Sequence, residues 1–447
     1  MMRLSEAAKA LGATMVGEDV LFTSVGTDSR AIQKNQLFVA LKGEKFDGHA
    51  YAAQALAEGA AAVMVNQSAN VSGLSSALVV DDTYQALGQL AAYWRSKFSV
   101  PVVAITGSNG KTTVKEMVAA ILRVGLTADA VLATTGNLNN HIGLPLTLLK
   151  LRETHRYAVV EMGMNHRGEI RYLTHIAKPS VVVINNAGNA HLGELGSYQA
   201  IAEAKGEIIE GLSADGTAIL NVDDQFFTLW KKLAQGKKMV SFGLQKNADV
   251  QASYQLNPAN SEVAIRTGKG EVSVNLAVPG LHNAMNALAA TATALALDVP
   301  LSNVKSGLEN FHPAKGRLQV FAGIQGTQVI DDTYNANPMS MKAAIDVLKG
   351  CVGQRILVLG DMGELGGDAP AMHREVGEYA KNAGIEMLYS LGDLSAEISK
   401  AYGGGKHYTA LENLLEDLKK NLQANTTVLV KGSRFMAMER VVKAITQ

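Results

Sequence analysis

A glycine-rich octapeptide carries the sharpest chemical signal in this chain. It follows the apolar run Val100–Ile105 and precedes apolar residues at helical spacing, so a strand, a loop and a helix are expected in that order. Glycines let backbone N–H groups curl around phosphate oxygens, Lys111 can reach the terminal phosphates, and the Thr112 hydroxyl can hold Mg²⁺. Ile105 stands where the general phosphate-loop pattern has its first glycine, which leaves the shorter form G-x-x-G-K-T. The predicted nucleotide-binding residues are Thr106, Gly107, Ser108, Asn109, Gly110, Lys111, Thr112 and Thr113.

Two polar side chains follow other expected strands of the same sheet. Glu161 ends the run that begins at Ala158, and His191 lies in a polar loop after Val181–Ile184. In an open α/β sheet, ligands meet the carboxyl ends of the strands, so both residues could ligate a metal ion beside the phosphate loop. Taken singly, a surface carboxylate and a hydrogen-bonded loop histidine are the ordinary interpretations. For Lys205, which lies between two glutamates in a short helical piece, spacing alone favours a solvated lysine.

Three further polar segments permit more than one interpretation. Asn137, Asn139 and Asn140 could form side-chain-capped turns or a recognition surface for an amide-rich ligand. The segment 331–338 (DDTYNANP) closes an expected strand and opens a helix, so capping alone could explain its polar residues. The segment 360–366 (GDMGELG) is rich in glycine but has no GKT element, which favours a substrate or structural role over a second triphosphate site.

Short apolar runs alternate with helix-period segments along the whole chain, a pattern typical of α/β sheets covered by crossover helices. The 447 residues exceed what one core usually serves. We predict three α/β domains: a small one over 1–82, a central one over 83–312 and a third over 313–447. The alternation from Lys246 to Glu271 predicts antiparallel strands appended to the central sheet, followed by a helix over 283–297.

Composition excludes several classes of protein. With 47% apolar and 18% charged residues, the chain is not predominantly disordered. Its 41 basic and 41 acidic residues cancel, so no general attraction to nucleic acid or anionic lipid is expected. The single Cys351 cannot form an internal disulfide, and neither a signal peptide nor a membrane-spanning run is evident. We expect a soluble cytoplasmic protein that neither binds nucleic acid nor inserts into a membrane.

Several long strings resemble the Mur ligases of bacterial cell-wall synthesis, and the resemblance covers essentially the whole chain. The strings are TGSNGKT (106–112), GNLNNHIGLP (136–145), EMGMNHRGEI (161–170), DDTYNANPMSM (331–341) and GDMGELG (360–366). They are most similar to those of the members that add a dipeptide. The resemblance implies an ATP- and Mg²⁺-dependent ligase that joins D-alanyl-D-alanine to UDP-N-acetylmuramoyl-tripeptide through an acyl phosphate. We expect it to act as a monomer.

The same resemblance assigns roles to residues that spacing leaves open. It implies a UDP-sugar-binding N-terminal domain that uses Ser29 and Arg30, a central ATP-binding domain, and a Rossmann-like C-terminal domain that binds the incoming dipeptide. Several Mur ligases carry a carbamylated lysine at the position of Lys205, which implies a metal ligand there. The implied catalytic residues are Lys111, Glu161, His191 and Lys205; further ATP contacts are Asn283, Arg317 and Asp332; substrate contacts are Asn137, Asn139, Asn140, Tyr334, Asn335, Lys431 and Ser433.

Other functions compete with this interpretation. A sister ligase that adds one amino acid, or a folylpolyglutamate-type synthetase, would share the phosphate loop. A nucleotide switch of the GTPase kind is expected to carry an N-K-x-D loop, and we find none. A catalytically silent nucleotide-sugar-binding protein is disfavoured because Lys111, Thr112, Glu161 and His191 are all present. Spacing assigns no acceptor for the amine proton.

Overall fold

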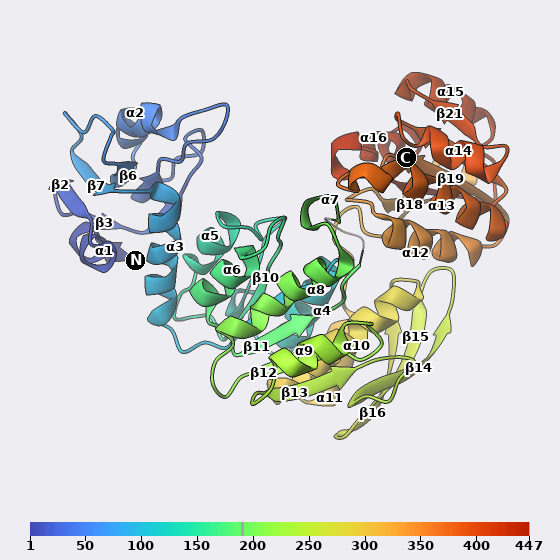
Figure 1. The fold of residues 1–447 in the computed structure, drawn as a ribbon, viewed down its shortest axis with the longest axis horizontal. Coiled ribbons are helices and arrows are strands. Elements are labelled where there is room, and N and C mark those ends of the chain that lie inside the picture. The colour runs from blue at the N-terminus through green and yellow to red at the C-terminus, as the bar shows by residue number, and fades with distance from the viewer. Residues whose placement is uncertain (189–191, 447) are drawn as a thin grey trace.

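The computed structural model describes residues 1–188 and 192–446. They form three α/β domains: a middle domain and, on either side of it, an N-terminal and a C-terminal domain (Figure 1). The strands of the three large sheets come from residues 14–80, 102–276 and 319–431. The α/β class and the three-domain architecture predicted from the sequence are confirmed. Among the described residues, no helix combines the length and the apolar character that crossing a membrane requires.

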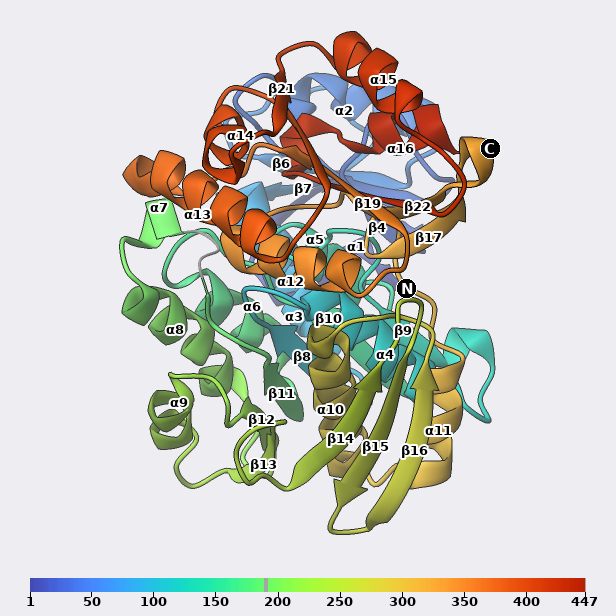
Figure 2. The ribbon, with the colours of Figure 1, turned by 90° about the vertical axis from the view of Figure 1, so that its right-hand side faces the viewer.

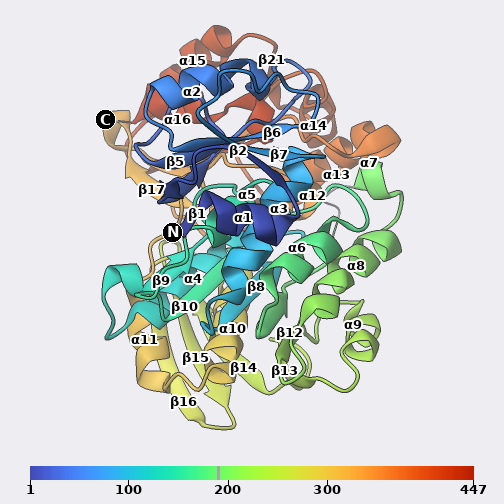
Figure 3. The same ribbon diagram turned by 90° about the vertical axis from the view of Figure 1, so that its left-hand side faces the viewer.

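The N-terminal domain is built on a five-stranded sheet in the order β2-β7-β6-β5-β4, parallel except for β2 (Figure 3). Its strands are β2 (Thr14–Gly17), β4 (Ser24–Gly26), β5 (Gln36–Val39), β6 (Ala62–Asn66) and β7 (Ser76–Val80). Helices α1 (Leu4–Leu11) and α2 (Ala52–Ala57) and the two-stranded pair β1 (Met2–Arg3) and β3 (Leu21–Phe22) complete the domain. The segment with Ser29 and Arg30 follows the carboxyl end of β4, which is the edge where a parallel sheet binds ligands.

The middle domain contains a nine-stranded sheet in the order β16-β15-β14-β13-β12-β11-β8-β10-β9. Its parallel part comprises β8 (Val102–Thr106), β9 (Val131–Ala133), β10 (Tyr157–Glu161), β11 (Val181–Ile184), β12 (Thr217–Asn221) and β13 (Lys238–Phe242). The antiparallel part comprises β14 (Val250–Leu256), β15 (Ser261–Thr267) and β16 (Gly270–Leu276). The predicted antiparallel extension is therefore present, and its last strand runs five residues beyond the expected end at Glu271.

Helices cover both faces of the parallel part of this sheet. In β8, Val102 and Ala104 pack into one core, whereas Val103 and Ile105 pack into the other, because successive side chains of a strand point to opposite faces. One layer holds α3 (Thr83–Ser96), α5 (Gly143–Leu148), α6 (Glu169–Ala177), α8 (Tyr198–Gly206) and α9 (Phe227–Leu233). The other holds α4 (Lys111–Arg123), α10 (Leu281–Ala296) and α11 (Leu301–Glu309). The helices cover the two faces of the sheet but not its carboxyl edge, where the phosphate loop follows β8.

The C-terminal domain has a six-stranded sheet in the order β17-β18-β22-β19-β20-β21, parallel except for β17. Its strands are β17 (Gln319–Ala322), β18 (Gln328–Asp332), β19 (Gln354–Gly360), β20 (Met387–Leu391), β21 (Lys406–Tyr408) and β22 (Thr426–Lys431). Its helices are α12 (Pro338–Lys349), α13 (Ala369–Asn382), α14 (Ala396–Tyr402), α15 (Leu411–Lys420) and α16 (Glu439–Ile445). Figures 1 and 2 show α12 on the side of this domain that faces the middle domain.

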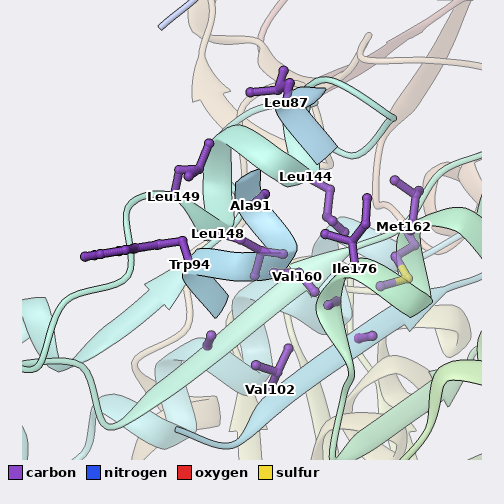
Figure 4. Close-up of a cluster of buried hydrophobic side chains, with 14 of the residues drawn as sticks. Leu87, Ala91, Trp94, Val102, Leu144, Leu148, Leu149, Val160, Met162 and Ile176 are labelled. Carbon is purple, nitrogen blue, oxygen red and sulfur yellow. The ribbon is translucent and has the colours of Figure 1, made fainter. Parts of the chain in front are cut away.

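Helix α3 joins the N-terminal domain to the middle one and packs into the core of the latter. The Asp82 carboxylate caps the helix by accepting N–H bonds from Tyr84 and Gln85. Figure 4 shows the cluster where side chains of α3 meet α5, α6 and the sheet: Leu87, Ala91, Trp94, Leu144, Leu148 and Ile176 are all less than a tenth exposed. The Trp94 indole also donates to the Leu151 carbonyl at 3.1 Å.

We predict that Leu144→Ala lowers the free energy of unfolding of the middle domain by about 2–5 kcal/mol, because it leaves a cavity in this cluster. Urea denaturation followed by tryptophan fluorescence can measure this, since both tryptophans of the chain, Trp94 and Trp230, belong to the same core. Leu126→Ala is the matched control: Leu126 is 41% exposed, so a change below about 0.5 kcal/mol is expected. Equal effects of the two substitutions would contradict the assignment of this core.

Candidate active site

The phosphate loop lies where predicted, between β8 and α4 at the carboxyl edge of the middle sheet. Gly110 immediately precedes α4 with φ of +82°. A Cβ at this position would lie 2.4 Å from both Asn185 Nδ2 and Asn286 Oδ1, so any other residue would be strained by the positive φ and would displace these two amides. The helix N-terminus begins at Lys111 and therefore directs its unpaired N–H groups toward the loop.

Two asparagines that follow β11 hold the loop from the side. Asn109 N–H donates to Asn186 Oδ1 at 2.9 Å, and Asn109 O accepts bonds from the side-chain amides of Asn185 and Asn186 at 3.0 and 3.1 Å. Asn185 Nδ2 also donates to Asn286 Oδ1 of α10 at 3.0 Å. The path of the loop is thus fixed by neutral amide groups.

Glu161 is the acidic centre of the site and is only 3% exposed at the end of β10. Its Oε2 accepts a bond from the Thr112 hydroxyl at 2.8 Å, and its Oε1 accepts one from Asn139 Nδ2 at 2.8 Å. The backbone N–H of Glu161 donates to Thr134 Oγ1 at 3.0 Å. A hydroxyl and a carboxylate side by side supply hard oxygen ligands, which are the ligands Mg²⁺ prefers. The donor set at Thr112 and Glu161 therefore fits magnesium.

Two lysines of the middle domain have lowered pKa values. Burial lowers the pKa of Lys111, and the neighbouring Arg317 charge lowers it further against the opposing effect of Glu161. Lys111 Nζ donates to the Gly107 carbonyl at 2.7 Å. Lys205, in α8, is 2% exposed, and burial together with the Lys111 charge lowers its pKa well below the ordinary value. The interpretation of Lys205 as a solvated lysine, which spacing alone favoured, is therefore wrong: the side chain is buried and lies within the electrostatic influence of Lys111.

The C-terminal domain contributes side chains to the same site. Arg317 Nη2 donates to Thr112 Oγ1 at 3.0 Å, and the Arg317 guanidinium lies 4.2 Å from the centre of the Tyr334 ring. Asn337 Nδ2 donates to Asn109 Oδ1 at 2.8 Å, and Asn337 also caps α12, which is the capping alternative that the sequence left open. These contacts place the third domain directly against the phosphate loop.

A cavity of about 620 Å³ opens between the two domains and brings together most of the predicted residues. Its walls include Ser108, Asn109, Gly110, Lys111, Asn137, Asn139, Glu161, Arg317, Asp332, Tyr334, Asn335, Lys431 and Ser433. Lys111, Arg317 and Lys431 supply positive charge to it. Within the described residues, three buried polar atoms around the loop lack a protein hydrogen-bond partner: Asn109 Nδ2, Asn185 Oδ1 and Arg317 Nε. Such atoms fit a polar, anionic ligand that would satisfy them.

A smaller and more apolar cavity of about 210 Å³ continues from the phosphate loop between α10 and α12. Thr113, Asn283, Phe311, Leu318 and Met339 are among its lining residues, and Asp332 stands at its border with the larger cavity. Apolar walls with a few polar groups suit a flat heteroaromatic base. Lys431 Nζ donates to Asp332 Oδ2 at 2.6 Å, so the carboxylate predicted to contact ribose is held by a buried lysine.

Some predicted residues lie elsewhere or serve other groups. Ser29 and Arg30 belong to the N-terminal domain, which is separate from the C-terminal domain in Figure 1, and neither lines the two cavities. The Arg30 guanidinium donates to the Asp28 carboxylate and holds its pKa down at about 2. Asn140 Oδ1 accepts N–H bonds at the start of α5, which is the turn-capping alternative. His191 lies outside the described residues.

Sequence reasoning assigned no role to several residues that the structure places in the site. Asn185, Asn186, Asn286 and Arg434 hold the phosphate loop or line the cavities. A sequence signal existed for one of them: Asn286 is three residues after Asn283, so both lie on one face of α10. Asn185 and Asn186 follow a buried strand in the same way as Glu161 follows its own.

The fold and this site together define a phosphate-loop nucleotide-binding enzyme in which a second α/β domain faces the phosphate loop. Comparison with known families is specific: the Mur ligase middle domain matches residues 105–294, the Mur ligase glutamate ligase domain matches 316–434, and the Mur ligase family catalytic domain matches 21–95. The chain belongs to the Mur ligase family, as its motifs predicted.

Full-length relatives share both sequence and structure with the chain. The UDP-N-acetylmuramoyl-tripeptide–D-alanyl-D-alanine ligase of Haemophilus influenzae is 43% identical over 455 residues, covering 100% of this chain and 99% of that protein. A crystal structure of MurF from Acinetobacter baumannii is 37% identical with a TM-score of 0.92, over 98% of this chain and 97% of that one. MurF ligase from Thermotoga maritima in complex with ADP is 28% identical with a TM-score of 0.84, over 96% and 98% of the chains.

We predict that Thr112→Val weakens the binding of nucleotide in the presence of Mg²⁺ by about tenfold or more, because it removes the hydroxyl that joins Glu161 and Arg317. Binding of the metal-free nucleotide in EDTA should change far less. Titration calorimetry with a non-hydrolysable ATP analogue separates the two conditions. Thr291→Val is the control, since the buried Thr291 hydroxyl donates to the Ala287 carbonyl within α10. Equal losses with and without Mg²⁺ would exclude Thr112 as a metal ligand.

Proposed function

We propose that this chain joins D-alanyl-D-alanine to the terminal carboxylate of UDP-N-acetylmuramoyl-tripeptide at the expense of ATP, in peptidoglycan precursor synthesis. The relatives with this activity match the chain over its full length. The observation that carries the proposal is the single cavity in which Lys111 and Glu161 of the middle domain face Tyr334, Lys431 and Ser433 of the C-terminal domain. Such a cavity can hold a nucleotide, an activated carboxylate and an amine together.

The arrangement accounts for the first chemical step. A carboxylate is a poor electrophile, and phosphorylation supplies it with a good leaving group. A carboxylate oxygen of the tripeptide attacks the γ-phosphorus of ATP, the bond to the ADP oxygen breaks, and an acyl phosphate forms. Lys111 and Arg317 lie at the phosphate loop, where their charges can stabilise the transferred oxygens. The smaller cavity beside Asn283 is the proposed adenine pocket, with Asp332 toward the ribose.

The second step forms the amide bond. The dipeptide amine attacks the acyl carbon, the tetrahedral species collapses with loss of inorganic phosphate, and a proton leaves the nitrogen. We assign the amine side of the cavity to the residues contributed by the C-terminal domain, and the tripeptide side to the loop with Asn137 and Asn139. Holding the two reactants in one enclosed space replaces a bimolecular encounter by an oriented one and limits hydrolysis of the acyl phosphate.

Magnesium, when bound, would neutralise charge on the nucleotide phosphates. Thr112 and Glu161 are the residues that would hold it, and we further propose Lys205 in its carbamylated form as a ligand. An amine must be uncharged to add carbon dioxide, and the depressed pKa of Lys205 favours that state. Asn139 keeps the Glu161 carboxylate oriented through its 2.8 Å bond.

The UDP-sugar end of the acceptor is assigned to the N-terminal domain. Arg30 follows the carboxyl edge of its sheet and is exposed, with its guanidinium ordered by Asp28. The two cavities are lined by residues of the middle and C-terminal domains, and we propose that the chain acts as a monomer. Nucleotide-linked substrates together with a single unpaired Cys351 fit a reducing cytoplasmic setting.

The proposed reaction predicts a strict dependence on both substrates. Phosphate release from ATP and Mg²⁺ should require UDP-N-acetylmuramoyl-tripeptide and D-alanyl-D-alanine together, and single amino acids should not replace the dipeptide. Lys111→Ala should lower this turnover by about a hundredfold or more. Lys231→Ala, on the exposed side of α9, is the control and should keep full activity. Phosphate release without an acceptor would instead indicate a nucleotide switch, and release with a single amino acid a sister ligase.

Carbamylation of Lys205 predicts a dependence on dissolved carbon dioxide. Activity measured in degassed, bicarbonate-free buffer should fall, with a higher Mg²⁺ concentration needed for half-maximal rate, and added bicarbonate should restore it. Lys205→Ala should be slow under both conditions and indifferent to bicarbonate. Activity of the wild-type protein that is unaffected by carbon dioxide would rule out the carbamate.

A further inference from the structure

The segment 360–366, here called the GDMGELG loop, forms part of the wall of the larger cavity. It connects β19 to α13, and its Gly363 and Glu364 line the cavity beside Ser433 and Phe435. A Cβ at Gly363 would lie 3.0 Å from Phe435 Cε1, so the loop backbone packs directly against that ring. No residue of the loop lines the smaller cavity proposed for adenine.

Three successive residues of the loop are held through their backbone. The Asp361 carbonyl accepts a bond from Ser433 N–H at 3.0 Å, and Gly363 N–H donates to Ser433 Oγ at 2.8 Å. Between them, Met362 N–H donates to His373 Nε2 at 3.0 Å. Ser433 thus bonds the residues before and after Met362, and the Met362 N–H itself is bonded by His373.

The geometry fixes the protonation of His373. The residue lies in α13 with no exposed surface, and its Nδ1 is 2.7 Å from the Ala369 carbonyl oxygen. A carbonyl only accepts, so the proton must be on Nδ1, and Nε2 then carries the lone pair that accepts the Met362 N–H. A second proton on Nε2 would face another donor and break that bond. The contact exists only with a neutral imidazole.

Charged groups around His373 come from two neighbouring elements. Asp361 of the loop and Glu397 of α14 favour the protonated form, but burial outweighs them and lowers the pKa of His373. Both carboxylates have partners of their own: Asp361 accepts N–H bonds from Asp393 and Ser395, and Glu397 pairs with Arg374 and Lys400. On the side of α12, Lys342 and Asp346 bond Glu375 and Tyr379 of α13.

We propose that His373 is a positioning residue for the ligation step: its neutral imidazole fixes the GDMGELG loop so that Gly363 and Glu364 present a defined wall to the incoming dipeptide. The proposal rests on the proposed function, since the dipeptide is the substrate assigned to this domain. The loop also touches the middle domain, because Gly193 N–H donates to the Glu364 carbonyl at 3.2 Å. Loss of the bond between Met362 and His373 would therefore disturb both the cavity wall that faces the dipeptide and the bond between Gly193 and Glu364.

Two substitutions separate the two bonds of the imidazole. His373→Gln can place an amide oxygen near the former Nε2 and keep an acceptor for Met362 N–H. His373→Asn can keep a donor to Ala369 but is too short to reach Met362. We expect His373→Asn to lower kcat/KM for the dipeptide about tenfold or more, and His373→Gln to retain activity within about threefold of wild type. KM for ATP should stay within about twofold in both variants, because the loop does not line the smaller cavity.

The pH profile provides a readout that a merely structural role would not move. As pH falls below the ordinary imidazole range, His373 becomes protonated and loses the Met362 bond, whereas glutamine does not titrate. The ratio of wild-type to His373→Gln kcat/KM for the dipeptide should therefore fall with decreasing pH. Protonation of the substrate amine affects both proteins equally and cancels in the ratio.

The outcomes distinguish this inference from the proposed function. If wild-type protein shows no dipeptide-dependent turnover, the proposed function fails and the inference fails with it. If wild type turns over, a constant ratio across pH overturns the inference alone. Two results for His373→Asn would also contradict the inference: an equal rise of KM for ATP and for the dipeptide, or a lowered thermal midpoint with unchanged kcat and KM. Either would mean that His373 has only a structural role in the core.

Discussion

The close packing of two asparagine side chains around Gly110 is the constraint on which the rest of the site depends. Asn185 from the sheet edge and Asn286 from α10 approach it so closely that the loop has a single path. The groups that hold Asn109 from the side are neutral amides, whereas the Gly107 carbonyl accepts a bond from the Lys111 side chain. Lys111, Thr112 and Glu161 are positioned by that path.

The site also contains several positively charged side chains, although burial disfavours their charged forms. Burial lowers the pKa of Lys111, the Arg317 charge beside it lowers that pKa further, and Lys431 is buried against Asp332. A polyanion entering the cavity relieves this unfavourable concentration of positive charge, so binding energy is stored in the free protein. Neutral amides shape the site and buried cations attract its ligand.

Elements with strong local signals were predictable from the sequence. The phosphate loop and the buried strands β6, β8, β11 and β20 follow from apolar runs and the glycine motif, whereas capping by Asn337 was one of two open alternatives. Strands β9 and β21 were not foreseen, because each has only three residues, and β13 begins with half-exposed positions that break the apolar pattern. Contacts between domains could not be inferred: Asn337 meets Asn109 across 228 positions, and no local pattern encodes that meeting. The enclosure of Lys205 is likewise a property of tertiary packing.

Because α3 packs into the core of the middle domain, the chain cannot be divided after this helix without damage to that core. A fragment that begins after residue 96 would lose Leu87, Ala91 and Trp94 and would expose the apolar faces of α5 and α6 to water. The N-terminal domain cannot be exchanged between relatives at that point unless α3 is exchanged with it. Recombination that preserves folding must cut before Asp82, whose carboxylate caps the helix.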